Sequence, residues 1–371
     1  MQISPDISSA FAKTLLDWSL TIDRPMPWRG ERNPYRIWLS EIILQQTRVA
    51  QGTSYYLKFL AAYPTVEDLA KANETEVLAL WQGLGYYSRA RNLHKAAQQV
   101  MILGGEFPGD YQGLLALAGV GPYSAAAIAS FAYGEQVAVL DGNVYRVLSR
   151  YFNINAPINK PIGHKLFRAL AQELVPSGKA KGYASAAGAH NQAIMDFGAT
   201  VCTPKNPSCG TCPFAKSCNA LVAGTVAQLP VKEGKIKRRD RYFDYVDVRS
   251  TAGELLIKER GAGDIWQGLF DFAMREQPAS FSNREDLEAS LSWLSLKQAT
   301  FSGTRPPVKH VLSHQDLFVQ FWRYELVDEP QVLPKGYRWI KASQLDQVGV
   351  PRVIERYLQD STLVLNFGDD L

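Results

Sequence analysis

Two carboxylates in this sequence have surroundings that suit acid and base catalysis. Glu41 lies in the apolar run at residues 35–50, where burial favours the neutral form of a carboxyl group and suits it to donate a proton. Asp141 follows the apolar segment 137–140 at the expected start of another helix, whose dipole stabilises negative charge. The alternatives are an ordinary ion pair for Glu41 and a simple N-cap for Asp141.

A glycine turn must place these acids. The helical pattern that begins at Leu114 breaks at Gly119 and Gly121 and restarts after Pro122. Glycine permits turn conformations that a side chain forbids, and free backbone N–H groups at a helix start bind phosphate. This stretch alone fits both an ordinary helix hairpin and one that grips nucleic acid.

All four cysteines of the chain lie within residues 202–218. Their spacing is Cys202-x6-Cys209-x2-Cys212-x5-Cys218, short enough for four thiolates to surround one metal centre. A zinc knuckle on the same cysteines is the alternative interpretation. Zinc sites usually use two C-x2-C pairs, however, and this segment has one.

Two segments combine aromatic and basic side chains. Trp28 and Arg29 are adjacent, and Tyr86 precedes Arg89 and Arg91 in the loop WQGLGYYSRARN (81–92). Aromatic rings stack on bases or enter base steps, while arginines hold phosphate. Core aromatics beside a solvated basic helix are the plain alternative.

Composition sets the limits of these readings. A chain of 371 residues predicts two domains, and a net charge of +4 permits a nucleic-acid partner without arguing for one. The first thirty residues mix charges, prolines and tryptophans, so we expect neither a signal peptide nor a membrane span. A cytoplasmic location follows, where cysteines serve as metal ligands more often than as disulfides.

The hydrophobic pattern divides the chain. Residues 11–220 predict an almost wholly helical body, including one helix over 35–50 with Glu41, Gln45 and Arg48 on one face. Residues 224–241 are polar and charged and predict a linker. After it, strands are predicted at 242–248, 254–258, 317–324 and 338–340, and helices at 286–294 and 351–359, which together indicate an α/β domain.

Taken together, the motifs resemble the A/G-mismatch adenine DNA glycosylases of the MutY family, over nearly the whole chain. The motifs that carry the resemblance are Trp38-Leu39-Ser40-Glu41 with Gln45-Gln46-Thr47, Gly83-Leu84-Gly85-Tyr86-Tyr87, the glycine hairpin, Leu140-Asp141-Gly142-Asn143, the cysteine loop, Trp266-Gln267-Gly268-Leu269 and Leu312-Ser313-His314.

The resemblance implies a multidomain fold. An all-α helix-hairpin-helix catalytic domain (1–223), related to endonuclease III, would carry a 4Fe–4S cluster on Cys202, Cys209, Cys212 and Cys218. A linker (224–241) and a C-terminal α/β Nudix-like domain for lesion recognition (242–371) would follow. We find no glutamate-rich Nudix box, so this domain is expected to recognise rather than to hydrolyse. Leu312 stands where many relatives have Phe.

The implied activity is base-excision repair: removal of adenine opposite 8-oxoguanine or guanine by a monomeric, cytoplasmic and nucleoid-associated bacterial enzyme acting on double-stranded DNA, with no membrane partner. Glu41 would protonate adenine at N7, and Asp141 would stabilise the oxocarbenium ion or trap it covalently, supported by Tyr123 and Asn143. The residues implied in binding DNA or its bases are Trp28, Arg29, Gln45, Gln46, Tyr86, Arg89, Arg91, Gly119, Gly121, Gln192, Ser313 and His314.

Tyr123 bears on the reaction type. In bifunctional relatives of the endonuclease III kind, a lysine at this place attacks the sugar and leads to strand cleavage. A phenol forms no Schiff base, so we expect a monofunctional enzyme that leaves an abasic site. The rival hypotheses are a lyase acting on oxidised pyrimidines and an iron–sulphur DNA-binding protein without catalysis.

Overall fold

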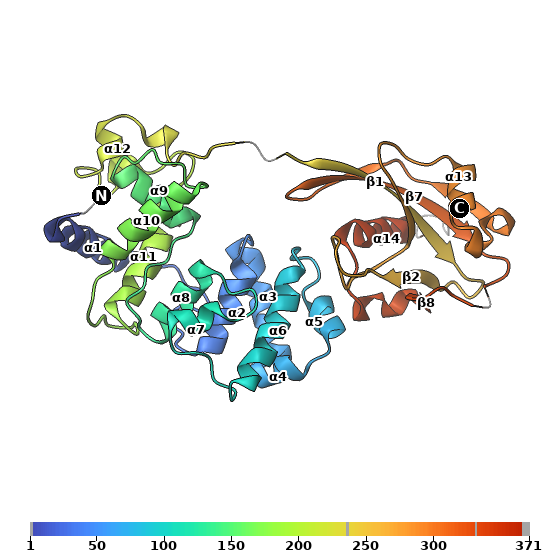
Figure 1. Cartoon of the computed structure of the whole chain (residues 1–371), viewed down its shortest axis with the longest axis horizontal. Helices are drawn as coiled ribbons and strands as arrows, with labels where there is room; N and C mark the ends of the chain where they lie inside the picture. The colour runs from blue at the N-terminus through green and yellow to red at the C-terminus, as the bar shows by residue number, and fades with distance from the viewer. Residues whose placement is uncertain (1–2, 235–236, 331, 366–371) are drawn as a thin grey trace. The chain divides into compact units, whose positions relative to one another are not determined.

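The computed structural model describes residues 3–234, 237–330 and 332–365 (Figure 1). The chain forms two compact units, each with its own packing. The helical unit comprises residues 1–71 and 92–234, and the sheet unit comprises residues 72–91 and 235–371. None of the helices in the described ranges is both long and apolar enough to cross a membrane.

The predicted helical body is confirmed. Its α-helices are α1 (Pro5–Ser19), α2 (Pro34–Leu44), α3 (Val49–Ala62), α4 (Val66–Lys71), α5 (Glu74–Leu80), α6 (Ser88–Ile102), α7 (Tyr111–Leu115), α8 (Pro122–Ala132), α9 (Gly142–Tyr151), α10 (Pro161–Leu174), α11 (Ala186–Thr200) and α12 (Asn219–Val222). Proline occupies the first turn of α1, α2, α8 and α10, where its missing N–H costs no helical hydrogen bond.

The helical unit is built on α1, α9, α10 and α11. Their apolar faces share one core in which Phe11, Leu148, Phe167 and Phe197 are buried, with Phe214 of the cysteine loop stacked on Phe11. Figure 1 shows α9 and α10 beside α11 in this part of the chain. The start of α9 is therefore fixed by its packing.

The predicted helix over 35–50 is wrong at its C-terminal end. Helix α2 ends at Leu44, and α3 begins at Val49. Gln45 has an extended ψ of 113°, and Gln46 has a left-handed φ of +57°. Glu41 lies on α2, whereas Gln45 and Arg48 lie in the turn, so the three do not share a helical face.

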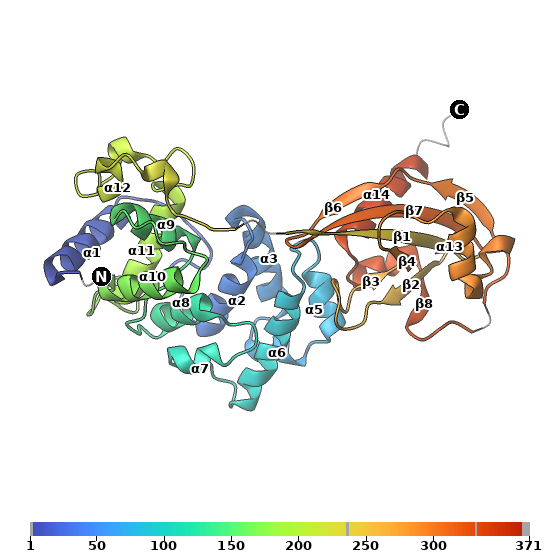
Figure 2. The same ribbon diagram turned by 45° about the horizontal axis from the view of Figure 1, so that its top comes forward.

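The sheet unit contains a mixed sheet, which has eight strands in the described residues. The strands are β1 (Arg239–Arg249), β2 (Leu255–Glu259), β3 (Phe270–Asp271), β4 (Ala273–Gln277), β5 (Thr300–Thr304), β6 (Val308–Val311), β7 (Gln315–Glu325) and β8 (Tyr337–Ile340). The two longest strands, β1 and β7, pair in parallel over their whole length. Figure 2 shows them side by side at the centre of the sheet.

Helices cover both faces of this sheet. Alternate residues of β1 and β7, among them Tyr245 and Phe321, pack against α14 (Arg352–Leu365). The residues between them, including Val246 and Tyr324, pack against α13 (Arg284–Ser290) and the short 3-10 turns after it. This period-two division between two cores is what a strand buried on both faces requires.

The strands predicted after residue 241 are confirmed, with β3 to β6 in addition, and so is the helix predicted at 351–359. The helix predicted at 286–294 is confirmed in part: α13 ends at Ser290, and residues 292–294 form a separate 3-10 turn. The segment predicted as a linker differs in part. Strand β1 begins within it, at Arg239, and Val231 accepts a hydrogen bond from Ile158 N at 3.0 Å. Residues 235 and 236 of that segment, and residues 366–371 of the predicted C-terminal domain, lie outside the described residues.

Candidate active site

The two predicted acids line one cavity of the helical unit. Glu41 comes from α2 and Asp141 precedes α9, while Tyr123 comes from the first turn of α8. All three line a cavity of about 510 Å³. Tyr123 and Asp141 follow Glu41 by 82 and 100 positions, so residues far apart in the chain meet at one cavity.

Burial sets the protonation of Glu41. Glu41 is 7% exposed, and burial raises the pKa of its carboxyl group to about 7. A hydrogen bond with the Tyr123 hydroxyl lowers this pKa, while the charge of Asp141 raises it further. The Tyr123 hydroxyl also lies 3.3 Å from the sulphur of Met195. Burial therefore favours the protonated form of Glu41, which is the form that can donate a proton.

Asp141 differs from Glu41 in the hydrogen-bond donors that contact its carboxylate. It caps α9: Oδ1 accepts a hydrogen bond from Val144 N at 2.8 Å, and Oδ2 accepts one from Asn143 Nδ2 at 2.7 Å. Burial raises the pKa of Asp141, but these donors and the Arg146 charge lower it. Burial has the largest effect, so the pKa of Asp141 still lies above its ordinary value, while the donors stabilise its charged form.

Arg146 ties this cap to the cysteine loop. Its Nη2 donates to Asn143 Oδ1 at 2.7 Å and to the carbonyl of Gly198 at 2.6 Å. Its Nε donates to the carbonyl of Cys202 at 2.6 Å. The orientation of Asn143, and through it that of Asp141, is therefore set by a side chain that also holds the loop.

Three residues lie where two hollows meet. Trp28, Glu41 and Gln192 line both the 510 Å³ cavity and a smaller hollow of about 30 Å³. The Trp28 ring is edge-on to Tyr56, with ring centroids 5.3 Å apart, and is largely buried. The apolar ring, the acid and the amide thus lie at one wall of the cavity, and their role in holding a base stays a prediction.

Sequence reasoning missed Asp196, which is 2% exposed and lines the same cavity. It accepts hydrogen bonds from Arg24 and, at 2.7 Å, from Arg29 Nη1. The predicted pocket residue Arg29 is thus engaged by this carboxylate. A signal was present, because Asp196 follows Gln192 by one helical turn and shares its face of α11.

The two glutamines of the turn after α2 reach the same cavity. Gln45 Nε2 donates to Ser124 Oγ on α8 at 3.0 Å, which ties this turn to the hairpin. Gln46 takes a left-handed conformation that a non-glycine residue adopts rarely, and such strain collects at functional sites.

The hairpin glycines meet different needs. Gly119 has a φ of +72°, and a Cβ there would lie 2.6 Å from Cβ of Asn92. Gly121 has an ordinary φ of −89°, caps α8 and has open space where a Cβ would be. Gly119 is therefore required by conformation, whereas Gly121 keeps the backbone accessible from outside.

The sheet unit contains three further residues that the sequence predicts to contact a base. Tyr86, Ser313 and His314 line one cavity of about 470 Å³, and the hydroxyls of Tyr86 and Ser313 form a hydrogen bond. Tyr86 is 48% exposed and has a left-handed φ of +50°. An exposed ring held in a strained conformation is available for stacking. Leu312 packs at the edge of the sheet core.

Arg89 and Arg91 have partners inside the sheet unit. Arg89 donates to the carbonyls of Leu84 and Gly85 at 3.3 and 3.2 Å and lies over the Trp81 ring at 5.0 Å. Burial lowers its pKa to about 10. Arg91 donates to the carbonyl of Gln267. Both side chains hold the loop, and their contact with phosphate stays a prediction.

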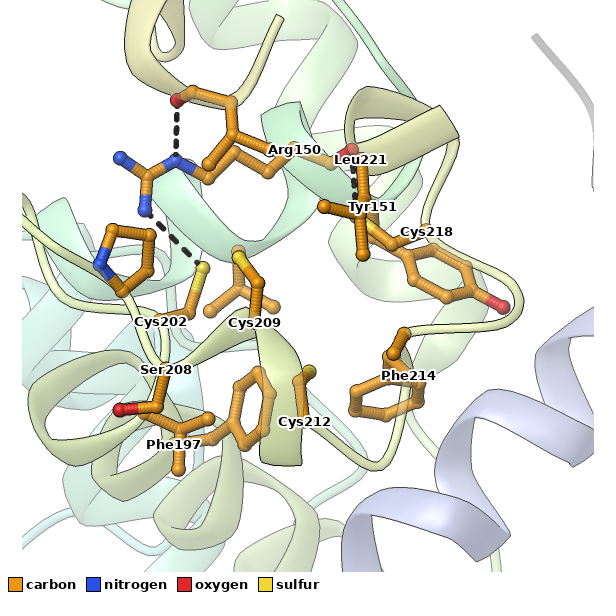
Figure 3. Close-up of a pocket in the computed structure, with 15 residues that line it drawn as sticks. Arg150, Tyr151, Phe197, Cys202, Ser208, Cys209, Cys212, Phe214, Cys218 and Leu221 are labelled. Carbon is orange, nitrogen blue, oxygen red and sulfur yellow. Dashed lines mark hydrogen bonds between the residues drawn. The ribbon is translucent and has the colours of Figure 1, made fainter. Parts of the chain in front are cut away.

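The four cysteines line one small apolar cavity, of about 30 Å³ (Figure 3). Burial raises the pKa of Cys212 to about 11 and also raises that of Cys218. Arg150 Nη1 donates to Cys202 Sγ at 3.5 Å. Across the described chain, no three His, Cys, Asp or Glu side chains gather tightly enough to hold a single metal ion. Four cysteine thiols at one cavity are the donor set that iron–sulphur clusters use.

Three family models match the chain. The model of the "HhH-GPD superfamily base excision DNA repair protein" matches residues 39–177. The "iron-sulfur binding domain of endonuclease III" matches residues 202–218, and a "NUDIX domain" matches residues 245–360. These matches confirm the predicted fold class: a helical repair domain with an iron–sulphur motif and a C-terminal Nudix domain.

Relatives match along most of the chain. The adenine DNA glycosylase of Buchnera aphidicola (subsp. Baizongia pistaciae) is 32% identical over 316 residues, which cover 83% of this chain and 84% of the relative. That of Homo sapiens is 31% identical over 94% of this chain and 73% of its own.

Solved structures resemble the helical part. A thermostable thymine-DNA glycosylase is 33% identical, with a TM-score of 0.53, over 58% of this chain and 97% of its own. An endonuclease III–DNA complex, 19% identical with a TM-score of 0.50, covers 60% of this chain and 99% of its own, and it supports the fold alone.

Proposed function

The chain belongs to the adenine DNA glycosylase family, and on that premise we propose that it excises adenine lying opposite 8-oxoguanine or guanine and leaves the strand uncut. It is a DNA repair enzyme that hydrolyses N-glycosyl bonds to remove adenine. The observation that supports the finer proposal best is the shared cavity of Glu41 and Asp141, with a raised pKa on the first and a hydrogen-bonded cap on the second.

The proposed mechanism divides the work between the two acids. An adenine rotated out of the duplex enters the cavity, and Glu41 gives its proton to N7 of the base. The C1′–N9 bond breaks with its electron pair leaving on the base, and the Asp141 carboxylate stabilises the positive sugar. Water adds to C1′, and its proton returns to Glu41. Tyr123 and Asn143 keep the two acids in place through their hydrogen bonds.

The absence of an amine supports a monofunctional reaction. Lyases of this kind attack the sugar with a lysine. Tyr123 stands at the hairpin position, and no lysine is among the residues of the described chain that line the cavity. With no group able to form a Schiff base, the product is an abasic site.

The cysteine loop is proposed to hold a 4Fe–4S cluster. Cys202, Cys209, Cys212 and Cys218 would bind it, and the cluster would join the loop into one rigid unit. The protein should be brown, with absorbance at roughly 400 nm and with iron and sulphide but no zinc. A colourless, active protein with one zinc would refute this assignment.

The sheet unit is proposed to read the opposite base, with Ser313 and His314 supplying polar contacts and Tyr86 stacking beside them. Residues 1–223 would carry catalysis, 224–241 the connection and 242–371 recognition. Both acids come from one chain, which is consistent with a monomer. We further propose that it acts at the nucleoid of a bacterial cytoplasm; the bacterial relatives that match most of the chain support a bacterial source.

The test uses four duplexes: adenine opposite 8-oxoguanine, adenine opposite guanine, thymine glycol opposite adenine, and thymine opposite guanine. The last is included because of the similarity to a thymine-DNA glycosylase. We expect release of adenine only, and strand breakage only after alkali. Cleavage without alkali would support the lyase alternative, and binding without release would support a non-enzymatic protein.

A further inference from the structure

A thioether lies beside the catalytic acids. Met195 of α11 lines the 510 Å³ cavity together with Glu41, Tyr123 and Asp141. The hydroxyl of Tyr123 donates a hydrogen bond to Met195 Sδ at 3.3 Å. The sulphur of a thioether is a weak acceptor, and a purely apolar side chain would fill the same space against the ring. Packing alone therefore does not account for a sulphur atom at this position.

The Tyr123 hydroxyl has two acceptors within reach but only one proton. It donates to Met195, and it also interacts with Glu41, whose pKa a hydrogen bond from this hydroxyl lowers. Burial, followed by the charges of Glu41 and Asp141, raises the pKa of Tyr123 well above its ordinary value, so the phenol keeps its proton. Because this proton points toward one partner at a time, Met195 and Glu41 compete for it.

The competition bears on which form of Glu41 is favoured. When the phenol donates to Glu41, it stabilises the carboxylate, which has lost the proton that catalysis needs. When the phenol donates to Met195, the lone pairs of its oxygen are free to accept a hydrogen bond from the protonated carboxyl group. A sulphur acceptor beside Tyr123 thus favours the acid form of Glu41.

The other charged groups near Glu41 have fixed partners or raise its pKa. The remaining titratable residues on the walls of the two hollows that Glu41 lines are Arg24, Glu31, Arg32, Asp141, Tyr183 and Asp196. Asp196 is paired with Arg24 and Arg29. Of the neighbours that act on the pKa of Glu41, the charge of Asp141 raises it and the Tyr123 hydroxyl lowers it. The choice of acceptor by this hydroxyl is therefore what Met195 can alter.

We propose that Met195 is a positioning residue for the catalytic acid: its sulphur accepts the hydrogen bond of Tyr123 and leaves the phenol oxygen to accept from Glu41, so that Glu41 retains its proton. In this role Met195 acts through Tyr123 and does not itself contact the reacting atoms. When adenine enters the cavity, the retained proton passes from Glu41 to the base. The inference rests on the proposed excision of adenine and adds a residue to that site.

The test is the pH dependence of adenine excision by the full-length protein. Single-turnover rates are measured on a duplex with adenine opposite guanine, at enzyme concentrations below saturation, so that the profile reflects the free protein. Met195→Leu keeps an apolar side chain but removes the acceptor, so Tyr123 donates to Glu41 alone. The high-pH limb should then move down by roughly 0.5 to 1 pH unit, the usual worth of one neutral hydrogen bond. Excision at pH 8 should fall roughly 3- to 10-fold, while excision at pH 5 should match wild type.

Two further proteins separate positioning from packing. Tyr123→Phe removes the donor, so its high-pH limb should move to higher pH. Adding Met195→Leu to Tyr123→Phe should move the limb no further, because without the hydroxyl there is no competition. Met101→Leu is the matched control for the loss of a thioether. Met101 is partly buried on α6 and is not among the described residues that line the cavity, so this change should leave the profile in place.

Each outcome decides for or against the proposal. A folded Met195→Leu protein that is slowed equally at every pH, or not at all, would overturn it, because the thioether would then serve packing alone. An equal shift with and without the Tyr123 hydroxyl would overturn it as well. If Met195→Leu does not fold, Met195→Ile, whose branch lies at a different carbon, carries the same expectation. A wild-type protein that releases no adenine at any pH refutes the proposed function itself.

Discussion

In the sheet unit, the buried Asp247 accepts hydrogen bonds from Arg249, Arg323 and Tyr357, whereas in the helical unit the buried Glu41 has a phenol and a second carboxylate as neighbours. Asp247 is fully buried and Glu41 nearly so. The two carboxyl groups differ in their partners rather than in their exposure. Burial beside arginines stabilises a charge, while burial beside an acid favours the neutral form.

Asp196 and Asp271 refine this comparison. Asp196 belongs to the helical unit but has two arginine partners, so both units contain a buried carboxylate paired with arginines. Asp271 has Arg260 at 2.6 Å, yet burial raises its pKa to about 6. For Glu41 and Asp271, desolvation outweighs the neighbouring donors, and the pKa of each is raised.

The largest effect is expected from Glu41→Gln. The amide has nearly the same shape but delivers no proton, so excision of adenine should fall between about 10²- and 10⁴-fold. Binding to a duplex with adenine opposite 8-oxoguanine should persist. Single-turnover rates and a binding titration measure the two properties, and wild-type excision by this variant would remove Glu41 from the mechanism.

Asp247→Asn tests the other side of the comparison. Removing one member of a buried charged group leaves its arginines without a charge partner, so the sheet unit should lose about 3 kcal/mol. Amide hydrogen exchange in β1 and β7 measures this loss. Asp17→Asn, at an exposed pair with Lys13, is the control and should change stability by less than about 0.5 kcal/mol. Unaltered exchange in β1 would contradict the structural role of Asp247.

The stability of the helical unit should depend on pH through Glu41. Its pKa of about 7 lies above the ordinary 4.5, so folding favours the protonated form. That contribution is complete below pH 4.5 and is lost as the pH rises through 7, by roughly 3 kcal/mol in all. Glu41→Gln cannot ionise there, so it should gain stability relative to wild type between pH 5 and 8. Urea unfolding of both proteins at pH 5 and at pH 8 measures the difference in their stability. A difference that does not change with pH would argue against the raised pKa of Glu41.

The smallest effect concerns the opposite base. 8-Oxoguanine differs from guanine by an oxygen and a proton, and the loss of one polar contact at that edge is worth about 1–3 kcal/mol. Ser313→Ala with His314→Ala should therefore reduce the preference for 8-oxoguanine about tenfold or more, while adenine opposite guanine is still cleaved.

A fragment provides the control for this double variant. It should end after Gly234 rather than near Ala223, because Val231 and Glu233 hydrogen-bond to Ile158 and Asn159 of the helical unit. The fragment should show the same loss of preference. A ratio of rates equal to that of wild type in both proteins would mean that the sheet unit does not read the lesion.

The sequence indicated the charged and reactive residues of the candidate site more readily than the turn and the ion pairs around them. Glu41, Asp141 and the cysteine spacing stand out because each places a charged or reactive group in an apolar or closely spaced context. The helix break at Gln45 and Gln46 does not stand out in the sequence, because neither residue is a turn former. The break depends on tertiary contacts, such as that of Gln45 with Ser124. Asp196 was missed because its arginine partners lie about 170 residues earlier in the chain.

The sheet shows the same limit. Strands β1 and β7 are recognisable in the sequence as long alternating patterns, and their alternate residues pack into two hydrophobic cores. Strand β3 has two residues, and β6 has four that are largely exposed, so neither has enough alternation to be recognised. Their positions come from pairing with β2 and β7, which is information that a local pattern does not contain.

The parallel pairing of β1 with β7 also dictates an order of events during synthesis. Paired residues such as Asp247 and Arg323 are 76 positions apart, so the centre of the sheet cannot form until the ribosome has released β7. The hairpin of α7 and α8 and the cap of α9 depend on contacts between near neighbours and can form much earlier. The helical unit ends at residue 234 and leaves the ribosome before β7, so it can fold on the nascent chain while β1 is still an unpaired strand. In that interval the apolar residues on both faces of β1 are open to aggregation or chaperone binding.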